Sequence, residues 1–193
     1  MSALADTHPP DAVPRNLTID AFFDWIELRE ERYELVDGTP VMMPFVKRSH
    51  ARVVSNIDRT LQQQLDPDRY LVTQGDFAIR TGVRSIRYAD VLVEAASDDL
   101  DGRTTDTPKL IFEVLSDMTT ANDFGPKKLE YMSLSTLDAT LILRQDKACV
   151  WLWERDGEGN WPDQPRIVET GAIELSRLAV TLPIDAIYRG IVR

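Results

Sequence analysis

The chain has a single cysteine, Cys149, which excludes an internal disulfide and a zinc site built from several cysteines. Cys149 stands in an apolar run, where a free thiol usually acts as a small core side chain. Long apolar runs are missing as well: no stretch of about 18 apolar residues occurs, so no membrane span is expected. The first residues lack the basic region and apolar core of a secretory signal, so the sequence predicts a cytoplasmic protein.

Basic side chains are also in short supply. Lysine and arginine together number 22 against 32 aspartates and glutamates, which gives a formal net charge of −10. This balance argues against a large non-specific nucleic-acid-binding surface, because phosphate contacts need lysine and arginine. A local basic groove is still compatible with it. The acidic excess fits either a set of metal-binding carboxylates or a solvated acidic surface.

The length of 193 residues and the hydrophobic content of 43% fit one globular domain with a substantial core. Residues 1–16 contain three prolines and few apolar side chains. They are expected to form a flexible arm, followed by a folded domain over residues 17–193.

Apolar periodicity predicts helices over residues 19–29, 47–65 and 123–134. Two extended runs joined by Asp37-Gly38 predict a hairpin over residues 32–43. Further strands are predicted over residues 70–80, 87–94, 110–115, 138–143 and 148–153. The expected fold is a single α/β domain in which helices flank a central mixed β-sheet.

Two acids stand in segments that otherwise have the pattern of buried strands: Asp90 in the run 88–94 and Glu113 in the run 109–116. An unpaired carboxylate there is costly, so such a group is in practice paired, protonated or bound to a metal. On adjacent central strands the two side chains would converge at one sheet edge, where two oxygen donors suit Mg²⁺. Spacing alone leaves a second explanation open, in which each acid pairs with a nearby arginine or lysine.

Lys127 lies early in the helix predicted after the Glu113 strand, with Tyr131 one turn later. A lysine beside a metal site can orient a water, help to deprotonate it, or stabilise charge on a transferring phosphoryl group. An ordinary solvated helix lysine is the alternative, and the adjacent Lys128 fits that role better.

The order of these residues resembles that of a known family. A run Tyr-Glu-Leu-Val-Asp-Gly at 33–38 precedes His50 on a helix, the runs 88–91 and 112–116, and a final set of Asp123, Lys127 and Tyr131 at steps of four. This order is similar to that of the Uma-type family of putative restriction endonucleases, within the PD-(D/E)XK nuclease superfamily. The match spans about residues 19–153, so the resemblance implies a restriction-endonuclease-like fold.

The resemblance also implies roles for individual residues. Asp90 matches the family's strand aspartate, a metal ligand, and Glu113 matches the acid of the next strand, a ligand and an activator of water. Lys127 looks like the family's catalytic lysine, placed on the following helix, and Glu34 looks like an additional acid that contacts the metal. His50 matches a helix histidine whose role the sequence does not define.

The chain departs from the family pattern at two places. Ala89 stands where the family usually has a proline before the aspartate, which weakens an argument for local rigidity but keeps the carboxylate. Val114-Leu115 follow Glu113, so the acid-X-lysine triplet is absent and only the displaced Lys127 can serve.

By resemblance, the chain is expected to be a DNA endonuclease that hydrolyses phosphodiester bonds with Mg²⁺ or Mn²⁺ as cofactor. Arg80, Arg84 and Arg87, together with His50, are the expected DNA contacts. Lys47, Arg48 and Arg52 at the start of the long helix could contact the DNA backbone too, and a scatter of surface charge is the alternative for these basic residues.

A homodimer is also expected, since two active sites would suit two DNA strands. Two other functions stay open. The first is a non-catalytic nuclease-like fold used for binding or assembly. The second is a metal-dependent phosphohydrolase that acts on small nucleotides.

Overall fold

The computed structural model describes residues 13–115 and 125–191. The helices described are α1 (Ile19–Ile26), α2 (Arg48–Gln62), α4 (Pro126–Met132) and α5 (Ile184–Ile187). The strands are β1 (Tyr33–Val36), β2 (Thr39–Met42), β3 (Tyr70–Thr73), β4 (Ala78–Gly82), β5 (Ser85–Tyr88), β6 (Val91–Ala95), β7 (Thr104–Thr105), β8 (Pro108–Leu115), β9 (Ala139–Arg144), β10 (Val150–Glu154), β11 (Arg166–Val168), β12 (Ala172–Leu175) and β13 (Val180–Pro183). Within this part of the chain, no helix is long and apolar enough to cross a membrane.

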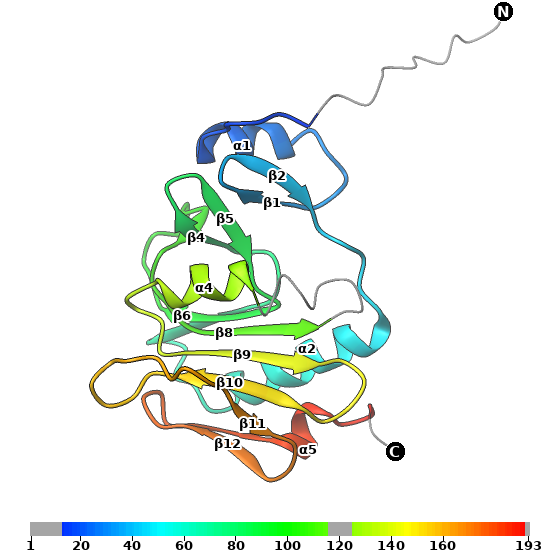
Figure 1. The fold of residues 1–193 in the computed structure, drawn as a ribbon, viewed down its shortest axis with the longest axis vertical. Coiled ribbons are helices and arrows are strands. Elements are labelled where there is room, and N and C mark those ends of the chain that lie inside the picture. Colours follow the sequence, from blue (N-terminus) through cyan, green and yellow to red (C-terminus); the bar gives the residue numbers. More distant parts are fainter. Residues whose placement is uncertain (1–12, 116–124, 192–193) are drawn as a thin grey trace, which may run out of the picture.

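The strands form two principal sheets and one strand pair (Figure 1). The first sheet has six strands in the order β11-β10-β9-β8-β6-β3, and it is mixed because β8 and β9 run parallel while its other neighbours are antiparallel. The second sheet has five strands in the order β2-β1-β5-β4-β7, and β12 pairs with β13. The expected α/β class with a mixed sheet is confirmed.

Strand β8 is buried on both faces of the six-stranded sheet, which explains its near-continuous apolar sequence. Its alternate residues Leu110, Phe112 and Val114 belong to the core that α2 covers. Ile111 belongs to a separate cluster on the other side, which includes Tyr131 of α4. Since side chains alternate along a strand, Glu113 shares the face of Ile111 and points toward α4.

Helix α2 follows the predicted apolar spacing and packs on the six-stranded sheet. Its buried residues Val53, Val54, Ile57 and Leu61 join the largest core cluster, which also contains side chains of β12, β13 and α5. Burial of this face, more than helix propensity, holds a helix of this length. The helix predicted over residues 47–65 is confirmed.

Helix α1 covers the five-stranded sheet with a second, smaller core. Phe22 and Phe23 of α1 pack with Leu35 of β1 and Ile86 of β5. The hydroxyl of Thr18 caps the helix by accepting a hydrogen bond from the backbone N–H of Ala21 at 3.2 Å.

The β1–β2 hairpin has the predicted two-residue turn. Asp37 and Gly38 have φ values of 45° and 78°, the left-handed conformation that a tight turn of this type requires. An added Cβ on Gly38 would lie 3.1 Å from the backbone of Asn16, so glycine is also favoured by the close approach of the preceding chain.

The single strand predicted over residues 87–94 is wrong in one respect. Strand β5 ends at Tyr88 and β6 begins at Val91, and the two strands belong to different sheets. Ala89 and Asp90 are the connection, so Asp90 lies at the junction between the sheets and not inside a strand. The run predicted over residues 70–80 is likewise divided between β3 and β4 of different sheets.

Candidate active site

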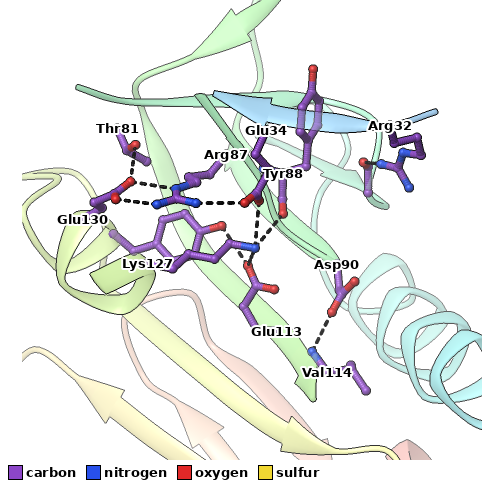
Figure 2. Close-up of polar contacts among 12 residues, drawn as sticks. Arg32, Glu34, Thr81, Arg87, Tyr88, Asp90, Glu113, Val114, Lys127 and Glu130 are labelled. Carbon is purple, nitrogen blue, oxygen red and sulfur yellow. Dashed lines mark hydrogen bonds and ion pairs between the residues drawn. The ribbon is translucent and has the colours of Figure 1, made fainter. Parts of the chain in front are cut away.

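Four of the residues singled out from the sequence come from separate elements and meet where the two principal sheets join (Figure 2). Glu34 lies on β1, Glu113 on β8 and Lys127 in the first turn of α4, while Asp90 occupies the junction before β6. Strand β6, which begins directly after Asp90, pairs with the Glu113 strand β8, and Val91 lies opposite Phe112, so the predicted adjacency is confirmed. Asp123 lies outside the described residues.

Lys127 is buried and bridges the two sheets. Its ammonium group lies 3.0 Å from Oε1 of Glu34 and 2.9 Å from Oε1 of Glu113, and it donates to the backbone carbonyl of Tyr88 at 3.1 Å. Three acceptors match the three N–H groups of an ammonium. The description of Lys127 as a solvated helix lysine is therefore excluded.

Lys128, the next residue, has a different environment. Its ammonium lies 4.4 Å from the ring centroid of Trp153, in a cation–π contact. The helix thus directs two adjacent lysines to different surroundings. This makes Lys128 a natural control for Lys127.

Glu113 is held from α4 at two points. Its Oε1 atom accepts a hydrogen bond from the hydroxyl of Tyr131 at 2.8 Å, in addition to the contact with Lys127. Lys127 and Tyr131 are four residues apart on α4, so both project from the same face of the helix. Burial, and the charges of Glu113 and Glu34, raise the pKa of Tyr131 well above its ordinary value, so its hydroxyl stays a donor.

Glu34 is saturated by protein donors. Its Oε1 atom accepts from the backbone N–H of Tyr88 at 3.2 Å as well as facing Lys127, and its Oε2 atom lies 2.9 Å from Nη1 of Arg87. Burial alone would raise the pKa of Glu34, but the charges of Lys127 and Arg87 and the hydrogen bonds from both outweigh it and lower the pKa.

The predicted metal contact of Glu34 stays a prediction. Both of its carboxylate oxygens already have cationic or N–H partners, and the side chain is only 7% exposed. In the structure Glu34 pairs with Lys127 and Arg87, which come from different elements.

Arg87 was expected to contact DNA, and the structure corrects this expectation. The residue is 1% exposed, and its guanidinium lies between two carboxylates, with Glu34 on one side and Glu130 on the other. Its Nε and Nη2 atoms donate to Glu130 at 2.8 Å and 2.5 Å, a bidentate pair, and the hydroxyl of Thr81 donates to the same carboxylate at 2.9 Å. Burial alone would lower the pKa of Arg87, but the hydrogen bonds and charges of Glu130 and Glu34 outweigh it and raise the pKa.

Glu130 was not singled out from the sequence. The available indication was its spacing: it stands three residues after Lys127 on a helix, so it borders the same face. Arg87 gave a second indication: an arginine inside a strand predicted to be buried needs an acidic partner.

Asp90 and His50 form a second pair at the site. Nε2 of His50 lies 3.1 Å from Oδ2 of Asp90, and the same oxygen accepts from the backbone N–H of Val114 at 2.6 Å. This second bond fixes the Asp90 carboxylate beside the peptide that follows Glu113. The predicted DNA contact of His50 is corrected, because the imidazole is buried against Asp90 and its side chain is 6% exposed.

Arg80 and Arg84 lie away from this network. Arg80 is exposed on β4, while Arg84 lies in the turn between β4 and β5 and pairs with Asp37 at 2.8 Å. Arg84 also donates to the side-chain oxygen of Asn16 at 3.3 Å. The expected DNA contacts of Arg80 and Arg84 stay predictions.

Asp90 and Glu113 are the carboxylates whose chemistry fits a divalent ion best. Both described hydrogen bonds of Asp90 use Oδ2, which leaves Oδ1 for another ligand, and the Asp90 side chain is 23% exposed. Mg²⁺ takes one or two protein carboxylates and completes its shell with water and substrate oxygens. Across residues 13–115 and 125–191 no group of three or more His, Cys, Asp or Glu side chains is arranged to hold a metal.

Comparison with known proteins places the chain among related sequences and folds. An uncharacterized protein of Synechocystis, slr1290, is 25% identical over 187 residues, which cover 95% of this chain and 97% of that protein. A crystal structure of a "putative nuclease" from Anabaena variabilis superposes with a TM-score of 0.68 at 14% sequence identity, covering 89% of this chain and 97% of that one. At that identity the likeness shows a shared fold.

The match that bears on identity is to a family model. The model of the Uma2 family, described as "Putative restriction endonuclease", matches residues 19–184. The matched region contains Glu34, Asp90, Glu113 and Lys127. Since it spans most of the sequence, the chain belongs to the Uma2 family of putative restriction endonucleases.

Proposed function

We propose that this protein is a Mg²⁺-dependent DNA endonuclease that hydrolyses phosphodiester bonds at the site formed by Asp90, Glu113 and Lys127. The observation that carries the proposal is the 2.9 Å contact between Lys127 and Glu113. It brings the lysine expected to act in catalysis against an acid expected to bind the metal. Family membership supports the reaction class. DNA is the substrate that the family description suggests.

Asp90 and Glu113 would hold the ion, with Mn²⁺ as a substitute for Mg²⁺. Asp90 directly precedes β6, which pairs with the Glu113 strand β8, and both residues supply hard carboxylate oxygens. When bound, such an ion polarises a phosphoryl oxygen and lowers the pKa of a bound water. His50 and the backbone N–H of Val114 hold the Asp90 carboxylate in one orientation, through the same oxygen.

Lys127 would orient the attacking water. All three of its N–H groups have protein acceptors, so it must exchange one of them to donate to a water. Glu34 and the carbonyl of Tyr88 can keep the ammonium in place while the contact with Glu113 is exchanged. Glu34 therefore acts as a positioning residue that holds Lys127 against the site.

The direct test is cleavage of supercoiled plasmid in Mg²⁺ or Mn²⁺ by the wild-type protein and by Asp90→Asn, Glu113→Gln and Lys127→Met variants. Each variant is expected to lose about 10²-fold or more of the cleavage rate, the range for losing a positioned catalytic group. Lys128→Met is the matched control and is expected to keep the wild-type rate, because its ammonium packs on Trp153. Equal cleavage by Lys127→Met and the wild-type protein would refute the assignment of Lys127.

A second candidate function, binding or assembly without catalysis, is favoured by a different observation. Lys127 already pairs with both Glu34 and Glu113, and its donors are saturated, as in an ion-pair network that serves only the fold. Calorimetric titration with Mn²⁺ separates the two functions. A catalytic site predicts binding that Asp90→Asn abolishes, whereas a non-catalytic fold predicts no binding that depends on Asp90 or Glu113.

A further inference from the structure

The segment between β2 and α2 exposes an unusual group of large apolar side chains. Phe45 is 99% exposed and Met42 is 60% exposed, and Val41 and Val46 are exposed beside them. Single exposed apolar residues are common, but several in one short segment mark a surface that contacts a partner. Residues 41–46 are called the apolar segment below.

The backbone of the apolar segment is poorly suited to pairing with another strand. β2 is an outer strand of its sheet. The backbone N–H of Met43 donates to the carbonyl of Arg32 at 2.8 Å, so the backbone groups of Thr39, Val41 and Met43 point toward β1. The backbone groups of the intervening residues, Pro40 and Met42, point to the free edge of the sheet. Proline has no N–H to offer at the free edge, so a partner must be held by side chains and not by strand addition.

The charge of the surrounding sequence selects the kind of partner. No aspartate or glutamate occurs from Gly38 to Ile57, in a chain that contains 32 of them. The same stretch contains Lys47, Arg48 and Arg52, all exposed in the structure. An apolar tip followed by cations is complementary to nucleic acid, which presents base faces flanked by phosphates.

A second copy of the chain fits this surface less well. In a two-fold symmetric interface the same patch meets itself, which would bring Lys47 and Arg48 of both copies close together. Like charges at such a contact are unfavourable.

The apolar segment also lies close to the proposed active site. It leads directly into α2, and His50 in the first turn of α2 contacts Asp90 at 3.1 Å. Phe45 and His50 are five positions apart in the chain, so their Cα atoms are at most about 18 Å apart. Figure 1 shows the connection descending from β2 to α2 on the side where β8 ends. A polymer bound at the active site can therefore reach Phe45.

We propose that residues 41–48 form a second DNA contact, in which Phe45 packs against or between bases while Lys47 and Arg48 contact phosphates. The proposal rests on DNA being the substrate of the site. Apolar side chains inserted between base steps bend the duplex and fix its register on the protein. Such a contact would hold the scissile strand against Asp90, Glu113 and Lys127.

The test measures affinity for a short fluorescein-labelled duplex by fluorescence anisotropy in EDTA, where no cleavage occurs. Phe45→Ala is expected to weaken binding about 5-fold to 100-fold, the range for losing one base–aromatic contact. The dependence of affinity on salt should stay unchanged, because no charge is lost. Arg48→Ala, in contrast, should reduce the salt slope by about one.

Leu100→Ala is the matched control. Leu100 is 93% exposed, and it stands among Asp98, Asp99 and Asp101, where a polyanion is repelled. Its substitution should leave the affinity at the wild-type value. Because Phe45 and Leu100 are both in solvent, neither change is expected to disturb folding.

The outcomes separate this proposal from the proposed function. If the wild-type protein cleaves plasmid and Phe45→Ala binds and cleaves equally well, the second contact is wrong while the nuclease assignment stands. If Phe45→Ala changes only self-association in sedimentation velocity, the apolar segment is a subunit interface and the proposal is wrong. If the wild-type protein neither binds nor cleaves DNA, both proposals fail together.

Discussion

Among single residues, Glu34 connects the two buried cations of the site. Its carboxylate accepts from Lys127 of α4 and from Arg87 of β5, so its negative charge stabilises both cations. Removing one partner of a buried ion pair leaves the others uncompensated, which costs about 3–5 kcal/mol. Glu34→Gln is therefore expected to lower the free energy of unfolding by an amount of this size at neutral pH.

The same residue predicts a pH dependence. The pKa of Glu34 is lower in the folded protein than in the unfolded chain, where it is about 4.3. Its stabilising contribution is thus present above that unfolded value and disappears as the pH falls through the folded-state pKa. Urea unfolding at neutral and acidic pH should show the difference between the wild-type protein and Glu34→Gln shrinking in acid.

An exposed glutamate of β12, Glu174, provides the control for this measurement. Glu174→Gln should change the free energy of unfolding by less than about 0.5 kcal/mol at either pH. A cost of Glu34→Gln that is the same at both pH values would contradict the ion-pair account.

At the scale of elements, helix α4 depends on its contacts. It has only seven residues, and its N-cap residue Gly125 makes no side-chain capping bond. A helix this short is marginal in isolation. Pro126 presets its first turn, and the bidentate contact between Glu130 and Arg87 ties it to β5.

Glu130→Gln is expected to lower the free energy of unfolding by about 2 kcal/mol, the range for hydrogen bonds to a charged group. In an Arg87→Met background, Glu130→Gln should lower the free energy of unfolding by less, because the arginine that pairs with Glu130 is gone. A double-mutant cycle from urea unfolding measures this coupling. Additive effects of the two substitutions would show that the contact does not hold α4.

At the scale of the whole molecule, the site joins two sheets that have separate cores. The core of α1 with the five-stranded sheet and the core of α2 with the six-stranded sheet are distinct clusters. Glu34 and Arg87 come from the five-stranded sheet, while Glu113 comes from the six-stranded sheet. The chain of contacts from Glu34 through Lys127 to Glu113 crosses between them.

We expect this connection to make the two sheets unfold together. In the wild-type protein, amide hydrogen exchange in urea should lose protection over residues 33–42 and 108–115 across the same range of denaturant. In Lys127→Met, residues 33–42 should lose protection first, since the five-stranded sheet loses one of its polar links to the six-stranded sheet. Lys128→Met again serves as the control, and simultaneous loss in both variants would show that other contacts couple the sheets.

The local elements of this protein were predictable because their causes are local. The spacing of apolar residues along α2 specifies a buried face, and Asp37-Gly38 specifies a tight turn. The acids at 90 and 113 were also identifiable, because a carboxylate in an apolar run needs a partner. The lysine at 127 was identifiable from its place early in the helix after the Glu113 run. The order of these residues along the chain further indicated the family.

The sequence by itself thus determined the α/β class, most element positions and the three residues proposed for catalysis. Only the tertiary structure decided that the chain changes sheets at Ala89 and Asp90, because strand pairing and not local pattern separates β5 from β6. It also decided the partners of each charge: Arg87 meets Glu34 from 53 residues away and Glu130 from 43 residues away. Contacts over such separations leave no periodic trace in a sequence, since they arise only when sheets and helices pack. For the same reason only the structure shows that Glu34 pairs with Arg87 and Lys127, and that Arg87 also pairs with Glu130 of α4.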